Sequence, residues 1–154
     1  MTFARVSIAV ALVVTSGVAV AQDAALYCAD LKRVASLASA RDRFASIAGK
    51  PREGNFSDTV LPLTGWTDCS VYGSGMYTCD SQPLRSKDEA ERAQMKTSDQ
   101  ILSCFAGSWL EIKDRSSPGY VVLHPARGPA SITLSIDEND KKEFVVRMTL
   151  FVRG

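Results

Sequence analysis

The four cysteines of the chain constrain its fold more than any other feature of the sequence. They are Cys28, Cys69, Cys79 and Cys104, an even number without a close C-x-x-C pair. Their spacing lacks the paired ligands of a zinc site and the motif of a thiol-redox enzyme. In a chain that leaves the reducing cytosol, such cysteines normally pair. We therefore expect two disulfides, no bound metal ion and no other cofactor.

The first 21 residues have the layout of a cleavable export signal. One basic side chain, Arg5, precedes an almost unbroken run of Val, Ala, Ile and Leu over residues 6–20. This run is shorter than the roughly 20 residues that a membrane-spanning helix needs. Ala19 and Ala21 match the A-x-A cleavage pattern, which predicts a signal peptide over 1–21. The alternative is an uncleaved N-terminal tether.

The remaining residues, 22–154, have the length and the charge balance of one ordinary globular domain. Basic and acidic residues are equal in number once Arg5 is removed, and no block of like charges stands out. The chain therefore lacks the excess positive charge that attracts nucleic acid or an anionic membrane. We expect a single domain in the periplasm or outside the cell, without a stable membrane anchor after cleavage.

Two stretches of the sequence have helical periodicity. The first runs from a cap at Asp23 to about Ala48, with Gly49 as its C-terminal cap. The second opens at the capping box Ser86-Lys87-Asp88-Glu89 and continues to about Ala106. Cys28 and Cys104 fall among the apolar positions of these two helices.

A period-two pattern between the helices predicts a β-hairpin. Its strands are residues 66–72 and 76–80, joined by the turn sequence Gly73-Ser74-Gly75. Pairing about Ser74 sets Val71 opposite Tyr77 and Cys69 opposite Cys79. Directly opposed residues come within disulfide reach, although a slip of one residue would break this inference.

The hairpin register favours one disulfide connectivity out of three. A Cys69–Cys79 bond inside the hairpin leaves Cys28 and Cys104, which would lock the two helices together. The main competitor joins Cys79 to Cys104, because the second helix directly follows the second hairpin strand.

The C-terminal third predicts a four-stranded antiparallel meander. Its strands are 109–113, 120–124, 131–137 and 142–153, with turns at 116–119 and 138–141. One apolar face combines Leu110, Ile112, Ile132, Leu134, Ile136, Phe144, Val146, Met148, Leu150 and Val152. The fold class is therefore α+β: two helices packed on a largely antiparallel sheet, in the order helix, β-hairpin, helix, meander. Self-association through the meander edge, with Val145, Arg147, Thr149 and Phe151 as the outer row, is one structural possibility.

Motifs of known catalytic chemistry are missing from the sequence. His124 is the single histidine, and no neighbouring residue indicates the orienting partner that a catalytic base needs. There is no G-x-S-x-G, H-E-x-x-H or glycine-rich phosphate loop. We assign no catalytic residue, and we keep as the alternative a small periplasmic hydrolase that uses carboxylates or His124.

Four aromatic residues are candidates for a binding patch, namely Trp66, Tyr72, Trp109 and Tyr120. Aromatic side chains supply large contact area at low entropic cost. By strand parity they lie away from the cysteines and the aliphatic face, either exposed or covered by a helix or loop. The sequence therefore favours an exported, disulfide-bonded protein that binds a protein or another envelope component through its surface, as an accessory factor, inhibitor or interaction factor.

Overall fold

The computed structural model describes residues 16–73 and 75–153, which form two α-helices, three short 3-10 helices and eight strands. In chain order these elements are α1 (Ser16–Leu37), η1 (Arg43–Ile47), β1 (Ala48–Pro51), η2 (Glu53–Asn55), β2 (Phe56–Thr59), β3 (Thr67–Tyr72), β4 (Met76–Asp80), α2 (Lys87–Cys104), β5 (Trp109–Glu111), η3 (Lys113–Arg115), β6 (Tyr120–Pro125), β7 (Ala130–Glu138) and β8 (Phe144–Val152). The first 15 residues of the predicted signal peptide lie outside the described residues.

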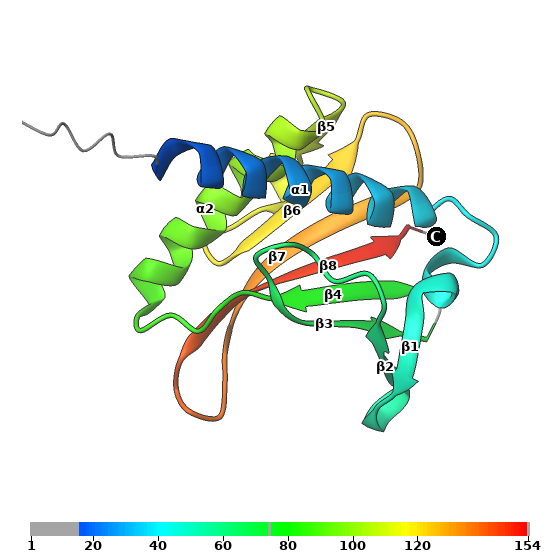
Figure 1. The fold of residues 1–154 in the computed structure, drawn as a ribbon. Helices are drawn as coiled ribbons and strands as arrows, with labels where there is room; N and C mark the ends of the chain where they lie inside the picture. The colour runs from blue at the N-terminus through cyan, green and yellow to red at the C-terminus, as the bar shows by residue number, and fades with distance from the viewer. Residues whose placement is uncertain (1–15, 74, 154) are drawn as a thin grey trace, which may run out of the picture.

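All eight strands belong to one antiparallel sheet, so the α+β class is right but the sheet is larger than the predicted meander. Its strand order is β1-β2-β3-β4-β8-β7-β6-β5 (Figure 1). The hairpin and the meander join because β4 pairs with β8, with Cys79 opposite Met148. The prediction that β8 forms an edge is wrong, since β8 lies between β4 and β7 and the edge strands are β1 and β5.

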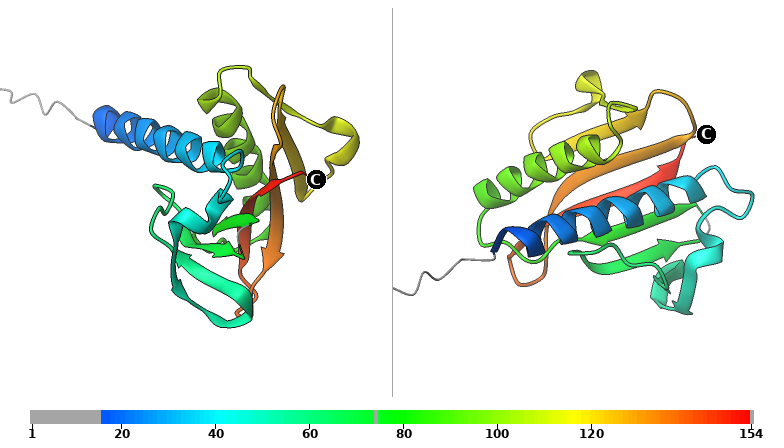
Figure 2. Two further views of the ribbon diagram at one scale, coloured as in Figure 1. Left: turned by 90° about the vertical axis from the view of Figure 1, so that its right-hand side faces the viewer. Right: turned by 45° about the horizontal axis from the view of Figure 1, so that its top comes forward.

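Both α-helices lie over the same face of the sheet (Figures 1 and 2). Strand side chains alternate between faces, and those that point toward the helices are almost fully buried. This core contains Leu31 from α1, Ile101 from α2 and Leu134 from β7. In addition, the buried Gln94 amide of α2 donates a hydrogen bond of 2.8 Å to the Leu134 carbonyl oxygen. Neither α1 nor α2 covers the opposite face, which we call the uncovered face.

The first helix differs from its prediction at both ends. It ends at Leu37 rather than near Ala48, and Asp23 lies inside it rather than at its cap. The apolar residues that extended the predicted pattern, Phe44 and Ile47, are buried from the separate turn η1. Phe44 packs there against Tyr77, with ring centroids 6.2 Å apart. The core accepts these two side chains from a separate turn that follows the end of α1, which the helical period does not reveal.

The segment between the end of the predicted first helix and the predicted hairpin contains the strands β1 and β2. These strands are four residues each, and all their residues are exposed or half-buried, so no buried apolar alternation marks them. Gly49 lies within β1 instead of capping a helix. A Cβ atom there would lie 3.3 Å from the Asp58 carbonyl oxygen, a tight contact that favours glycine at this position.

The second helix begins as predicted, whereas the strand after it turns its other set of side chains toward the core. The Ser86 hydroxyl accepts a hydrogen bond from the Glu89 amide, which confirms the cap. In β5, Trp109 is 5% exposed and stacks on Phe105, while Leu110 is 56% exposed. The prediction that Leu110 faces the core is therefore wrong. The stacking of Trp109 on the end of α2 sets the orientation of this short strand.

The four cysteines form two disulfides, Cys28–Cys104 and Cys69–Cys79, which is the connectivity that the sequence favours. The hairpin register is confirmed at Val71 and Tyr77. It shifts by one residue beyond Cys69, where Asp68 has a positive φ of 42°. This bulge lies beyond the disulfide, at the end of the hairpin that is away from the turn. The two cysteines therefore remain opposed, with Cα atoms 4.0 Å apart.

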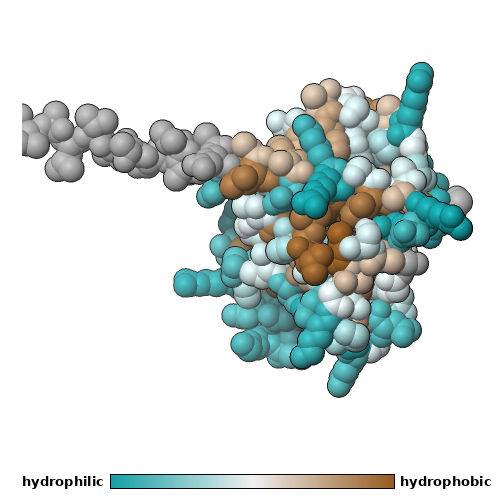
Figure 3. All heavy atoms as spheres, turned by 45° about the vertical axis from the view of Figure 1, so that its right-hand side comes forward, coloured by the Kyte–Doolittle hydropathy of each residue, from teal (hydrophilic) through white to brown (hydrophobic). Residues whose placement is uncertain are grey.

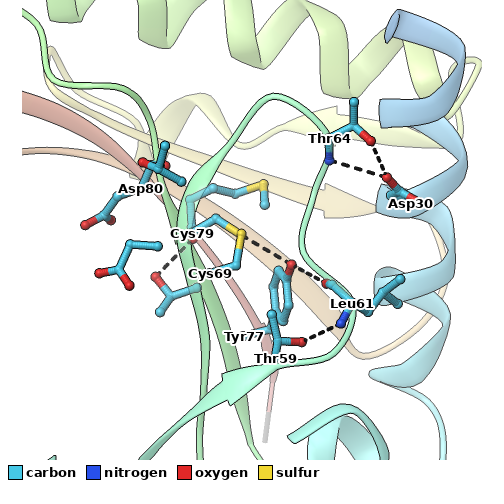
Figure 4. Close-up of a disulfide and its surroundings, with 12 residues drawn as sticks. Asp30, Thr59, Leu61, Thr64, Cys69, Tyr77, Cys79 and Asp80 are labelled. Carbon is cyan, nitrogen blue, oxygen red and sulfur yellow. Dashed lines mark hydrogen bonds between the residues drawn. A yellow bond between two sulfur atoms is a disulfide. The ribbon is translucent and has the colours of Figure 1, made fainter. Parts of the chain in front are cut away.

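A loop of residues 60–66 crosses the hairpin disulfide and ties it to α1 (Figure 4). The Tyr77 hydroxyl donates a hydrogen bond of 2.8 Å to the Leu61 carbonyl oxygen and lies 3.2 Å from the Cys79 sulfur. Asp30 of α1 accepts hydrogen bonds from the backbone and hydroxyl of Thr64. The loop is thus fixed at both ends over the buried hairpin.

Some hydrophobic atoms of the molecule reach solvent. On the side drawn in Figure 3 they gather near the centre and are framed by hydrophilic side chains. Among residues 16–73 and 75–153, no helix is long and apolar enough to span a bilayer. The two disulfides fit a protein that matures outside the reducing cytosol.

Candidate functional site

The uncovered face carries side chains in rows that cross the strands. The first row is apolar and joins Phe56, Tyr72, Met76 and Phe151 on β2, β3, β4 and β8. Each residue stands directly opposite the next in the strand register, and the rings of Phe56 and Tyr72 lie 4.8 Å apart. Two of these large side chains, Phe56 and Met76, line one side of a hollow, because the next row contains only small ones.

Small hydroxyl side chains form the floor of that hollow. Ser70, Thr78, Thr149 and Thr133 stand opposite one another on β3, β4, β8 and β7. Thr78 donates a hydrogen bond of 3.2 Å to the Met148 carbonyl oxygen. These side chains are small, so they leave the hollow open, and their hydroxyl groups make its floor polar.

Charged side chains form the opposite wall, with Arg147 at the centre. Its Nε and Nη2 atoms donate to the two carboxylate oxygens of Asp80 at 2.7 and 2.9 Å. Its Nη1 atom lies 2.9 Å from a carboxylate oxygen of Asp137. The hydrogen bonds with Asp80 are the main cause of a raised pKa of Arg147, and the negative charges of Asp80, Asp137 and Asp68 add to it.

A second arginine closes the end of the hollow in the same way. Arg52, between β1 and η2, pairs with Asp58 and donates to Asp68 at 2.6 Å. Hydrogen bonds with Asp68 and then with Asp58 raise the pKa of Arg52. Each arginine is thus shared between two aspartates, so each group of three keeps one negative charge.

Two hollows adjoin each other and share three lining residues, and we call them together the groove. One, of about 460 Å³, is lined by both arginines and by Glu53, Phe56, Asp68, Ser70, Met76, Thr78, Asp80 and Thr149. The other, of about 440 Å³, shares Asp68, Asp80 and Arg147 and extends to Val145, Asp137, Glu138 and Asn139. Two arginines and five carboxylates line this groove, which leaves it strongly negative in a chain whose formal net charge is +1.

His124 lies apart from the groove and has no geometry for base catalysis. Its Nδ1 atom is 3.1 Å from the Arg153 guanidinium, which can only donate, so the proton of the neutral ring resides on Nε2. Burial, followed by the charges of Arg153 and Arg115, lowers the pKa of His124. In the described part of the chain, no carboxylate pairs with His124.

The structure does not gather the four predicted patch aromatics. Tyr72 and Tyr120 both lie on the uncovered face and are 40% and 43% exposed, but three strands separate β3 from β6. Trp109 is buried against Phe105. Trp66 lines a different hollow together with Tyr27 of α1. Only Tyr72 belongs to the apolar row that borders the groove.

The groove residues escaped the sequence reasoning because their grouping depends on long-range pairing. Asp80 and Arg147 are 67 positions apart and meet only through the β4–β8 pairing. Asp68 reaches Arg52 from the β3 bulge, for which the sequence has no marker. The one signal of the groove in the sequence is a charged residue, such as Arg147, at a strand position that faces away from the core. Across the described residues, no group of three or more His, Cys, Asp or Glu side chains could hold a metal ion.

The groove is thus an open, negatively charged channel with an apolar end, on a rigid disulfide-linked sheet. Comparison with known proteins adds no assignment, because the chain matches no protein-family model, no curated protein and no solved structure.

Proposed function

We propose that this chain is an exported binding protein of the cell envelope that holds a partner in the groove on its uncovered face. The observation that carries the proposal is the meeting of an apolar row, a hydroxyl floor and two arginine–aspartate groups on the face that the helices leave bare. Binding sites combine apolar surface with a few well-placed polar groups in this way.

The ion pairs support binding because they hold the groove in shape before a partner arrives. Arg147 connects β4, β8 and the end of β7, and Arg52 connects β2 with the β3 bulge. The Cys69–Cys79 bond lies behind the same strands on the core side. A preorganised surface spends less free energy on ordering when it binds. Of the hydrolase alternative, the form that uses His124 gains no such support, since Arg153 engages the Nδ1 lone pair of His124.

The proposed site can be tested by filling the groove. Thr149→Tyr places a large side chain on the floor, at an outward strand position that tolerates an aromatic residue. Met95→Tyr makes the same kind of change on the exposed surface of α2 and serves as the matched control. In affinity capture from an envelope extract, wild type and Met95→Tyr should retain the same partner. Thr149→Tyr should retain at least tenfold less, and equal capture by all three proteins would place binding elsewhere.

The proposed compartment can be tested on the natively isolated protein. We expect its sequence to begin at Gln22 and its four thiols to resist alkylation unless they are first reduced. The cleavage site lies within the first turns of α1, so cleavage would leave the helix from Gln22 onward with its disulfide to α2. An N terminus at Met1, or four free thiols, would contradict export with cleavage.

A further inference from the structure

The negative charge of the groove and its position beside the apolar row specify the chemistry of a partner. We infer that the groove binds an extended peptide segment that carries one apolar side chain and, about four residues further on, arginine or lysine. This inference rests on the proposed function and adds the class of partner.

The charge argument begins with the arginines, which do not neutralise the groove. Each is already shared between two aspartates, Arg147 between Asp80 and Asp137 and Arg52 between Asp58 and Asp68. An anionic partner would have to compete with these carboxylates, because each guanidinium group already binds two of them. A cationic group instead finds carboxylate oxygens with remaining acceptor capacity.

Two further carboxylates stand at the borders of the groove without an ion-pair partner among the described residues. Glu53 lines the hollow near Phe56, and Glu138 lines the other hollow next to Asp137. Both residues are exposed. Charge complementarity of this kind increases the association rate and selects against partners of like charge.

The geometry favours a peptide over a compact cation. The groove follows the strands from Met76 at its apolar end to Val145 and Asp137 at its acidic end. Met76 and Asp80, which both line the groove, are four residues apart on β4, and this corresponds to about 13 Å at strand spacing. A peptide with extended backbone therefore reaches from the apolar row to the carboxylates within about four residues, whereas a small polyamine has no group for the apolar end.

Three probes test this inference on the mature, disulfide-bonded protein by fluorescence anisotropy or by competition. The first is a blocked, labelled hexapeptide with phenylalanine at its first position and arginine at its fifth and sixth. The second has glutamate in place of both arginines, and the third is unlabelled spermidine. We expect the arginine peptide to bind, to weaken steadily as salt is raised, and to exceed the glutamate peptide by at least tenfold.

A matched pair of double variants localises the binding. Glu53→Gln with Glu138→Gln removes two groove charges without touching either arginine. Asp42→Asn with Asp99→Asn makes the same charge change at exposed positions outside the groove. The groove variant should bind the arginine peptide about fivefold to tenfold more weakly at low salt, and the control should match wild type.

The possible failures are distinct. Equal binding of the glutamate peptide, equal effects of both double variants, or displacement by spermidine at the concentration at which unlabelled arginine peptide displaces the label would each overturn the inference. If no peptide binds while Thr149→Tyr still abolishes partner capture, the proposed function stands and the basic-peptide inference fails. If Thr149→Tyr leaves capture intact, the proposed function itself fails.

Discussion

Arg147 and Asp80 form a two-pronged ion pair across β8 and β4, with nitrogen–oxygen distances of 2.7 and 2.9 Å. They are 67 residues apart in the sequence and stand directly opposite each other in the strand register. The pair therefore joins the predicted hairpin to the predicted meander on the same face as the groove. Its energetic contribution tests whether this junction is formed as described.

A double-mutant cycle measures that contribution. With Arg147→Gln, Asp80→Asn and the double variant, we expect a coupling free energy of about 1 kcal/mol at low ionic strength, since the pair is bidentate but partly exposed. The same cycle on the exposed α2 pair Lys87–Glu91, whose atoms are 3.9 Å apart, should give about 0.3 kcal/mol. Urea unfolding supplies the values. Equal coupling free energies for both pairs would argue that the Arg147–Asp80 pair does not hold the groove in shape.

The two disulfides should differ in their effect on stability. Cys28–Cys104 closes a separation of 76 residues and Cys69–Cys79 one of 10. Chain-entropy estimates give losses of about 4.5 and about 2.7 kcal/mol when each pair is replaced by serine. Denaturant unfolding of the two double variants measures both losses. A larger loss for the hairpin pair would show that the helix-to-helix bond contributes little to the stability of the sheet.

Stability should fall in alkaline solution because two tyrosines are buried. Burial is the main cause of the raised pKa values of Tyr27 and Tyr77. The folded chain thus holds these protons more strongly than the unfolded chain, whose phenols titrate near about pH 10. The stabilisation is complete below that pH and is lost as the pH rises above it. In urea titrations from pH 8 to 11, Tyr27→Phe with Tyr77→Phe should lower the slope of stability against pH. An unchanged slope would contradict the burial of both phenols.

Stability should also fall in weak acid through the single histidine. Burial and two arginines lower the pKa of His124 in the folded chain, while the unfolded side chain titrates near about 6.5. The unfolded state therefore gains a proton first, and stability declines as the pH falls below that value. His124→Gln should flatten the stability profile between pH 7 and 5.5. A profile identical to wild type would show that His124 titrates alike in both states.

Local chemistry was enough to predict several elements of this fold. The sequence Gly73-Ser74-Gly75 allowed a turn that fixes Val71 opposite Tyr77, and this register brought Cys69 and Cys79 together. Ser86 and Glu89 marked the start of α2, because a cap depends only on residues within one turn. In these cases the deciding contacts are close in the sequence.

Other elements depend on contacts that the local sequence does not contain. The end of α1 at Leu37 follows from the burial of Phe44 on Tyr77, and the orientation of β5 follows from the stacking of Trp109 on Phe105. The groove depends on the pairing of β4 with β8, which no nearby motif indicates. Of the four predicted aromatic residues, Tyr72 joins the apolar row beside the groove, whereas Trp109 packs against Phe105 in the core.

The most direct test of partner binding on the uncovered face uses the methionine methyl groups as reporters. Met76 lines the groove, Met95 is 60% exposed on α2, and Met148 is fully buried in the core. NMR spectra of the methyl-labelled mature protein should be recorded with and without the captured partner. The account predicts a large shift or broadening of the Met76 signal with the Met95 signal unchanged. A change at Met95 with Met76 unaffected would contradict it.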